Sequence, residues 1–283
     1  AVDLQPTRYG QVHSAVAFSS IEFLSQALTL KQFDLSILSH VTRVLHEKGK
    51  AYGVEVMSSD KKRYHIKGKT VILAASTLES PRILLSSNIP GECIGHYLTD
   101  HSIVTANGVL DVTPFPKILG SIGIIIPASE ETPFQINLGG PDGYEWTHYK
   151  KMPLKDELDV GYFAGYGSIE ARFENRVYLH PSKKDKFGLP KIEVDFKLSA
   201  RDKRVIQQMS SAMASTAEAM EIQLICKGNK SQIQLLPLGS FHASGTCRMG
   251  NNPYTSVVNE YGESHYVEDL YIVGNSTLPS MGA

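Results

Sequence analysis

A stretch late in the sequence gathers side chains suited to proton transfer. From Phe241 to Gly250 it reads Phe-His-Ala-Ser-Gly-Thr-Cys-Arg-Met-Gly, which places one imidazole beside two glycines and a hydroxyl. Histidine is the side chain best suited to moving protons near neutral pH, and small neighbours let the backbone approach a flat molecule closely. His242 is therefore our candidate catalytic residue. By itself, one histidine among the ten in the sequence would more often be structural, so the assignment depends on the rest of the chain.

A second candidate stretch joins a strand to a helix. Thr70 to Ala75 is a continuous apolar run, typical of a strand buried on both faces in a parallel sheet. A helix is expected directly after it, with Ser76 or Thr77 as the cap and Glu79 in the first turn. A strand that runs through small residues into a helix N-terminus can receive a cofactor, although an ordinary strand–helix connection is about equally expected.

The remaining pattern predicts how these stretches are positioned. We expect a helix or helical loop over 14–30, with Ile21, Leu24 and Leu28 on one face. Strands are expected over 33–45, 52–57, 61–66, 103–109, 118–126, 134–138, 162–173, 175–180, 191–196 and 233–238. The strands after residue 100 have no helical period between them, which predicts an antiparallel sheet distinct from the opening α/β part. The predicted fold class is α/β plus antiparallel β-sheet (α+β).

A long helix and a final strand complete the prediction. Ser199 to Asp202 forms a variant capping box, and the helix after it carries Val205, Met209 and Met213 on one face. We interpret the methionines as core filling rather than as a binding surface. Residues 270–273 are expected to form a strand, 274–276 a tight turn, and a helix is expected to begin at Thr277 or Ser280. Because a domain rarely ends at a helix start, we expect the chain to be truncated.

Composition limits the classes of function. The 283 residues are 42% apolar and 20% charged, with a formal net charge of −1 and no long basic run, so nucleic acid is not an expected partner. The longest apolar run, over 122–127, is too short to span a bilayer. Three widely spaced cysteines fit neither a disulfide framework nor a metal site. The opening residues do not form a signal peptide, but the true N-terminus can lie elsewhere, so we assign no localisation (cytoplasm and periplasm both stay open).

Three motifs in order resemble the glucose-methanol-choline (GMC) family of flavin oxidoreductases. Residues 71–87, Val-Ile-Leu-Ala-Ala-Ser-Thr-Leu-Glu-Ser-Pro-Arg-Ile-Leu-Leu-Ser-Ser, resemble its second signature. Residues 242–250, followed by Ser-Val-Val-Asn at 256–259, are similar to its histidine segment, and 270–279 to its terminal flavin-contacting segment. Residues 175–179 and 185–190 resemble the sugar-oxidising bacterial members, the gluconate dehydrogenases among them. Three motifs in the family's order make a chance similarity unlikely.

The resemblance implies an FAD-dependent enzyme that oxidises a CH–OH group of a sugar or polyol, with hydride transfer to flavin N5. His242 would be the base that takes the hydroxyl proton. The residues implied in FAD binding are Val41, whose backbone would face the adenine, Ala75 and Ser76 near the ADP part, and Gly274 and Asn275 near the flavin. The helix expected at Thr277 would aim its positive end toward the isoalloxazine. Residues 1–100 and 237–283 would belong to the FAD-binding α/β domain and 101–236 to the substrate domain, with no metal and an unassigned electron acceptor.

The sequence also departs from the family pattern. The family's GxGxxG fingerprint is absent, since the nearest match, Gly165 to Glu170, lacks the third glycine and lies in the β-rich region. Ser76 stands where the family usually has glycine, and Gly274-Asn275 where many members have Asp-Gly or Asp-Ala. The second catalytic residue of the family, a His or Asn, would follow Ala283. We therefore expect the isolated chain to bind FAD weakly or not at all and to have no turnover.

The sequence also bears on a second histidine and on two alternative functions. We interpret His101, in Thr99-Asp100-His101, as structural and leave it out of the site. A binding domain that kept the scaffold but lost the cofactor stays open as an alternative function, because the fingerprint is missing. A lyase of the same family also stays open, and oxidase against dehydrogenase is not decided.

Overall fold

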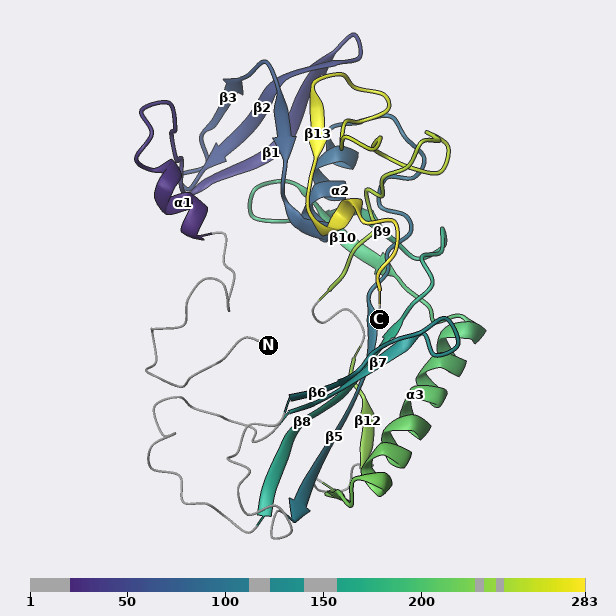
Figure 1. Ribbon diagram of the computed structural model, residues 1–283. Coiled ribbons are helices and arrows are strands. Elements are labelled where there is room, and N and C mark those ends of the chain that lie inside the picture. Colours follow the sequence, from purple (N-terminus) through teal and green to yellow (C-terminus); the bar gives the residue numbers. More distant parts are fainter. Residues whose placement is uncertain (1–20, 112–122, 140–156, 227–231, 238–241, 283) are drawn as a thin grey trace.

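The chain folds into two parts, which Figure 1 shows one above the other. The computed structural model describes residues 21–111, 123–139, 157–226, 232–237 and 242–282. The predicted helical residues 14–20, the predicted strand residues 118–122, the turn over 140–143, and Leu238 and Phe241 lie outside the described residues. No helix in the described ranges is long and apolar enough to cross a membrane.

The upper part is built on two small sheets. An antiparallel sheet contains β1 (Ser39–Glu47), β2 (Lys50–Ser58) and β3 (Arg63–Lys67), in that order. A parallel pair contains β4 (Val71–Leu73) and β13 (Leu270–Ile272), which are far apart in the sequence. The helices of this part are α1 (Ile21–Ala27), α2 (Ser76–Ser86) and the short 3-10 helix η2 (Asn275–Thr277). The predicted strands β2 and β3 pair as an antiparallel hairpin, and the predicted parallel pairing of β4 is confirmed.

The parallel pair buries only one of its faces. The buried face belongs to the core of the upper part and is made of Val71, Leu73, Leu270 and Ile272. Burying one such side chain completely stabilises the fold by about 1.5–3 kcal/mol. Ile72, between two of them, is 65% exposed. The prediction of burial on both faces is therefore wrong for this strand, because successive side chains point to opposite faces and only one set contacts the core.

The lower part is an antiparallel sheet covered by a helix. Its strands are β5 (His101–Asp111), β6 (Gly123–Ile126), β7 (Phe134–Gly139), β8 (Glu157–Ser168), β11 (Gln223–Leu224) and β12 (Ile233–Leu235). The sheet order is β11-β5-β8-β7-β6, and β12 also pairs with β5. The helix α3 (Ala200–Ala219) lies along the sheet in Figure 1. The predicted combination of an α/β part with an antiparallel sheet is confirmed.

The long helix follows its predicted pattern closely. Ser199 Oγ accepts the Asp202 amide, and the Asp202 carboxylate accepts the Ser199 amide, so the capping box is present. Met209 and Met213 are fully buried in the core of the lower part, which confirms them as core residues. A Cβ on Gly165 of β8 would lie 2.6 Å from Met209 Cγ. This glycine therefore serves close packing of α3 on the sheet, in agreement with its rejection as part of a dinucleotide fingerprint.

A fourth sheet, the hairpin of β9 (Arg176–Lys184) and β10 (Pro190–Asp195), is separate from the large antiparallel sheet and packs against α2, so the expectation that these strands belong to the large sheet is wrong. Arg82 of α2 connects the two elements. Its guanidinium donates to Asp185 Oδ2 at 2.8 Å and to Pro190 O at 2.8 Å. The Arg82 side chain is 8% exposed, so most of this ion pair is shielded from water.

Replacing Arg82 by methionine is expected to lower the free energy of unfolding by about 2–3 kcal/mol, because the Asp185 carboxylate and the Pro190 carbonyl lose a buried donor. Burial alone would raise the pKa of Asp185, but the Phe187 amide, Arg82 and the Leu189 amide together lower it. Because the pKa of Asp185 is lower in the folded chain than in the unfolded chain, this carboxylate contributes stability at pH values above its unfolded-state pKa. The contribution is lost as the pH falls through its folded-state pKa. Urea unfolding at neutral and acid pH measures both effects. Arg43→Met, at an exposed position on β1, is the control, and an equal loss in the two variants would contradict the prediction.

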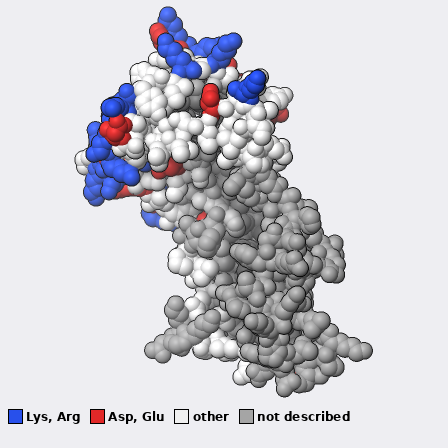
Figure 2. Space-filling view, turned by 90° about the vertical axis from the view of Figure 1, so that its left-hand side faces the viewer, with Lys and Arg blue, Asp and Glu red and all other residues white. Residues whose placement is uncertain are grey.

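The charged surface of the upper part carries both signs. Figure 2 shows blue Lys and Arg side chains over this part with red Asp and Glu side chains beside them. Examples of close pairs are Lys50 with Asp269 at 2.7 Å and Lys62 with Asp60 at 2.9 Å. Over the whole chain the two signs nearly cancel, since the formal net charge is −1.

Candidate active site

The His242 segment is bound through its backbone to the turn after β13. Three of its amides donate to carbonyl oxygens of η2: Gly245 to Asn275 at 3.2 Å, Cys247 to Ser276 at 2.8 Å and Met249 to Thr277 at 2.8 Å. The donors are alternate residues, as expected of a nearly extended backbone. The segment therefore lies along the carboxyl end of β13.

Two threonines tie the same segment to the start of α2. The Thr77 hydroxyl donates to Ala243 O at 2.6 Å, and the Thr246 hydroxyl donates to Thr77 O at 2.6 Å. Both threonine side chains are buried, so these bonds do not compete with water. The residue directly after His242 is thus fixed relative to α2.

The start of α2 differs from the prediction. Its N-cap residue is Ala75, and no side chain caps the helix, so the assignment of Ser76 or Thr77 as the cap is wrong. The Thr77 hydroxyl is used for Ala243 instead. The first amides of a helix need partners and carry a partial positive charge. Without a side-chain cap, this helix start keeps donors for another group.

The structure brings four of the five predicted cofactor residues to one edge. Ala75 and Ser76 follow β4, and Gly274 and Asn275 follow β13, whose carboxyl ends meet because the strands are parallel. The helices α2 and η2 that begin there contact each other. Val41 lies apart from them on β1, although it packs against the same core cluster as Ala75. The edge has the arrangement at which open α/β sheets bind ligands.

The backbone at this edge is unusual at two places. Ser76 has φ +68° and Gly274 has φ +96°. Glycine adopts such angles readily, whereas serine is strained by them. Apart from its two chain neighbours, no described residue has an atom within 4 Å of a Cβ built on Gly274, so space is open beside its backbone. The helix predicted to begin at Thr277 is not found, since η2 ends there and residues 278–282 are not helical.

Replacing Ser76 by glycine is expected to raise the free energy of unfolding by about 0.5–1 kcal/mol. The gain is the relief of about 1–2 kcal/mol of left-handed strain, reduced by the larger entropy of glycine in the unfolded chain. Thermal and urea unfolding measure it. Ser86→Gly, at the last residue of the same helix, is the control and should destabilise. Stabilisation by both changes, or by neither, would contradict a strain confined to Ser76.

A second histidine lies beside His242. The rings of His101 and His242 meet edge to face, with centroids 5.0 Å apart and planes at 86°. Asp100 Oδ1 accepts the backbone amides of both histidines, at 2.7 Å from His101 and 3.3 Å from His242. The contact is possible because Thr99 and Ser244 exchange two backbone hydrogen bonds, at 2.9 and 3.0 Å. The sequence analysis left His101 out of the site. One indication of a role there was present in the sequence, the run of three polar residues Thr99-Asp100-His101 before an apolar strand.

Protonation differs between groups of the site. Burial is the main cause that lowers the pKa of His101, and the charge of His242 lowers it further, while Asp100 and a hydrogen bond with the Gly282 backbone act in the opposite direction. His101 is therefore predominantly neutral at neutral pH. Burial raises the pKa of the Cys247 thiol to about 12, so this cysteine is no nucleophile despite its place in the segment.

Several buried polar atoms around this edge lack a hydrogen-bond partner within the described part of the chain. They are Asp100 Oδ2, His101 Nδ1, Ser244 Oγ and Ser276 Oγ. Leaving such a group unpaired costs about 1–3 kcal/mol, so native proteins seldom keep several together. Together with the uncapped helix start and the open space at Gly274, these atoms fit a flat, polar group bound at the edge. No cluster of three or more His, Cys, Asp or Glu in the described ranges could hold a metal ion.

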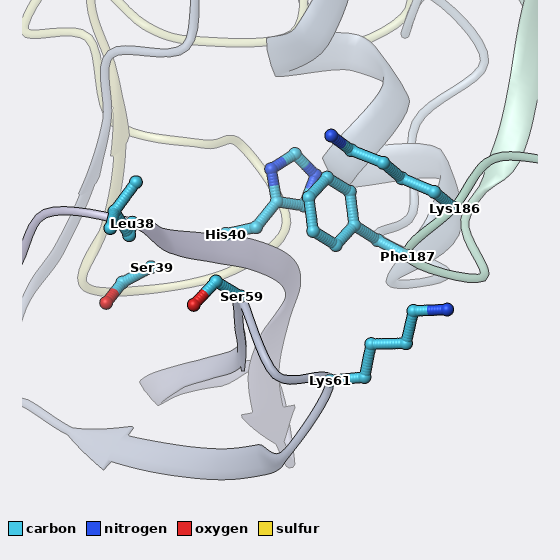
Figure 3. Close-up of a pocket in the computed structure, with 7 residues that line it drawn as sticks. All are labelled: Leu38, Ser39, His40, Ser59, Lys61, Lys186 and Phe187. Carbon is cyan, nitrogen blue, oxygen red and sulfur yellow. The ribbon is translucent and has the colours of Figure 1, made fainter.

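A separate pocket of about 340 Å³ lies at the start of β1, and Figure 3 shows the side chains around it. His40 stacks on Phe187, with centroids 4.1 Å apart and planes at 13°. The pocket is lined by Leu38, Ser39, His40, Ser59, Lys61, Lys186 and Phe187. None of the predicted site residues lines it, so it does not belong to the edge that holds His242.

Comparison with known proteins identifies the class to which this arrangement belongs. The models of the GMC oxidoreductase family match residues 11–103 with the N-terminal part and 171–283 with the C-terminal part. The chain belongs to the GMC oxidoreductase family, as its motifs predicted. Membership of the family implies a flavin cofactor.

Individual relatives cover most of this chain. It is 28% identical to C-glycoside 3-oxidase of Arthrobacter globiformis, over 89% of the chain and 50% of that protein. It is 25% identical to 2-methyl-1,2-propanediol dehydrogenase of Mycolicibacterium austroafricanum, over 88% of the chain and 51% of that protein. The fold matches that of pyridoxine 4-oxidase from Mesorbium loti with a TM-score of 0.59 at 17% identity, covering 87% of this chain and 53% of that one. The chain spans about half the length of the curated relatives it matches.

Proposed function

We propose that the protein to which this chain belongs is an FAD-dependent oxidoreductase that oxidises a CH–OH group of a sugar or polyol. Two relatives described above are named for the oxidation of a glycoside and of a diol, which supports this substrate class. Of the structural observations, the one that carries the proposal is the attachment of the His242 segment to η2 and to Thr77. The proposal is supported because this imidazole then lies beside an edge at which several buried polar atoms lack partners in the described part of the chain.

The residues proposed to hold FAD are Val41, Ala75, Ser76, Gly274 and Asn275. Backbone amides at the uncapped start of α2 are donors for the anionic part of the cofactor. Gly274 lets the cofactor come close to the backbone, because no side chain occupies the space there. In this proposal residues 1–100 and 237–283 form the FAD-binding part, and 101–236 form the substrate part.

His242 is proposed to take the proton of the substrate hydroxyl on a ring nitrogen. When bound, the flavin supplies the acceptor for the hydride that leaves the carbon bearing this hydroxyl, so that the alcohol becomes a carbonyl. A neutral imidazole has the basicity for this role near neutral pH, and the exposed position of His242 lets a substrate reach it. The Asp100 carboxylate and the Thr77 hydroxyl hold the backbone on either side of the ring.

The proposal is tested with the protein as its gene encodes it. The purified protein should be yellow and release FAD on denaturation. Anaerobic addition of a panel of sugars and polyols should bleach the absorbance of the oxidised flavin, with formation of the carbonyl product. Residues 1–283 alone should bind FAD weakly and show no turnover. Absence of flavin from the encoded protein, or product formation without flavin reduction, as a lyase would give, would overturn the proposal.

A further inference from the structure

His101 and His242 form a close pair at the junction of the two parts of the molecule. His101 begins β5 of the antiparallel sheet, whereas His242 directly precedes the residues that attach to α2 and η2. Their rings are 5.0 Å apart at 86°, and the Asp100 carboxylate binds the backbone amides of both. Asp100 is 3% exposed, so this clamp is shielded from water.

Two features of its surroundings act on the His101 ring. Its Nδ1 is buried and has no hydrogen-bond partner in the described part of the chain. Burial lowers the pKa of the ring, while the Gly282 backbone acts in the opposite direction. Because burial is the larger of these effects, the ring is predominantly neutral at neutral pH.

The groups that face the pair determine how many protons it holds. Those facing His101 are the imidazole of His242, the carboxylate of Asp100, the ring of Tyr166 at 6.1 Å and the Gly282 backbone. Two imidazolium charges with ring centres 5.0 Å apart repel each other, and the Asp100 carboxylate already accepts two backbone amides. Protonation of one ring therefore opposes protonation of the other.

We propose that His101 is a positioning residue for His242: it fixes the plane of the His242 ring by edge-to-face contact and restricts the pair to a single proton. This inference rests on the proposed function. When His242 takes up the hydroxyl proton, His101 stays neutral and holds the ring without adding a second charge. The two roles can be separated, because the contact needs a ring and the restriction needs a titratable nitrogen.

A titration of the imidazoles tests the inference without any turnover. In the encoded protein with ¹⁵N-labelled histidine, the ring signals of both residues should shift in two coupled steps. In His101→Phe the His242 signals should shift in a single step, whereas His65→Phe, at an exposed site on β3, should leave both steps unchanged. Independent single-step titration of the two rings in the unsubstituted protein would overturn the inference. This measurement stands even where a variant fails to fold or the proposed function fails.

Anaerobic flavin reduction separates the two roles. His101→Phe keeps a ring and should retain the rate constant within about threefold, and the acid side of the pH–rate profile should show one proton, as in the unsubstituted pair. His101→Asn removes the ring and should lower the rate constant by about ten- to a hundredfold with KM little changed. An unchanged rate in His101→Asn, or a change in KM alone, would overturn the positioning role. If the unsubstituted protein is not reduced by any sugar or polyol, the proposed function fails, and the titration still decides the coupling.

Discussion

Replacing His242 by glutamine is expected to slow the reduction of the flavin by substrate by a factor of about 10² to 10⁴, the usual contribution of a general base. Glutamine keeps a polar side chain of similar length but cannot take the hydroxyl proton. The backbone bonds of Gly245, Cys247 and Met249 do not involve the side chain, so the fold and the bound flavin should remain. Rapid-mixing absorbance under anaerobic conditions measures the rate constant, and the flavin spectrum and melting temperature report on binding and folding.

The pH dependence gives a second criterion for His242. In the unsubstituted protein the rate constant should fall toward acid pH, because a protonated imidazole cannot accept the hydroxyl proton. In His242→Gln the remaining rate should lose this acid limb. His65→Gln is the matched control, since His65 is exposed on β3 and distant from the junction. A rate constant within threefold of the original in His242→Gln would rule out the role of general base.

Much of the fold followed from local patterns in the sequence. The capping box at Ser199 and the stripe of Val205, Met209 and Met213 predicted α3 and its buried face, because both signals lie within one element. The apolar run before α2 predicted a parallel strand but not its exposed face. Exposure of Ile72 depends on which element covers each face of β4, and that information lies far away in the sequence.

The candidate site was predictable only in part, for a related reason. The edge that collects Ala75, Ser76, Gly274 and Asn275 follows from strand–turn–helix patterns and from parallel pairing. The position of His101 depends on the pairing of Thr99 with Ser244, which joins residues distant in the sequence through backbone atoms alone. No side-chain pattern encodes such a pairing. The role of Thr77 was missed for the same reason, since a helix-capping residue and a residue that binds another segment look alike in sequence.

The backbone pairing of Thr99 with Ser244 also places the candidate site at the junction of the two parts. β5 of the antiparallel sheet begins two residues after Thr99, and Ser244 lies two residues after His242. The two backbone hydrogen bonds therefore fix the start of one part against the histidine segment of the other. A substrate held by the lower part would meet groups positioned by the upper part at this junction. Changes that move the histidine segment should consequently impair catalysis even when no catalytic side chain is altered.

Replacing Gly245 by alanine is expected to move the histidine segment and to lower the free energy of unfolding by about 4 kcal/mol. Gly245 has φ +90°, a conformation that costs an alanine about 1–3 kcal/mol. A Cβ there would also lie 2.3 Å from Tyr97 O, a backbone atom that cannot move aside alone, and such overpacking adds about 1–3 kcal/mol. Urea unfolding measures the loss, and flavin reduction should slow because the His242 segment shifts.

Gly274→Ala provides the matched control for this change, and the pair separates steric clash from backbone strain. Gly274 has φ +96°, similar to Gly245, but apart from its two chain neighbours no described residue has an atom within 4 Å of its Cβ position. Gly274→Ala should therefore introduce only backbone strain, and its loss of free energy of unfolding should be about 2 kcal/mol smaller than that of Gly245→Ala. Because the open space beside Gly274 is where we place the flavin, Gly274→Ala should weaken FAD binding more than its stability loss explains. Equal losses of stability in the two variants would mean that the contact with Tyr97 relaxes at little cost, and unchanged FAD affinity in Gly274→Ala would remove that residue from the proposed cofactor site.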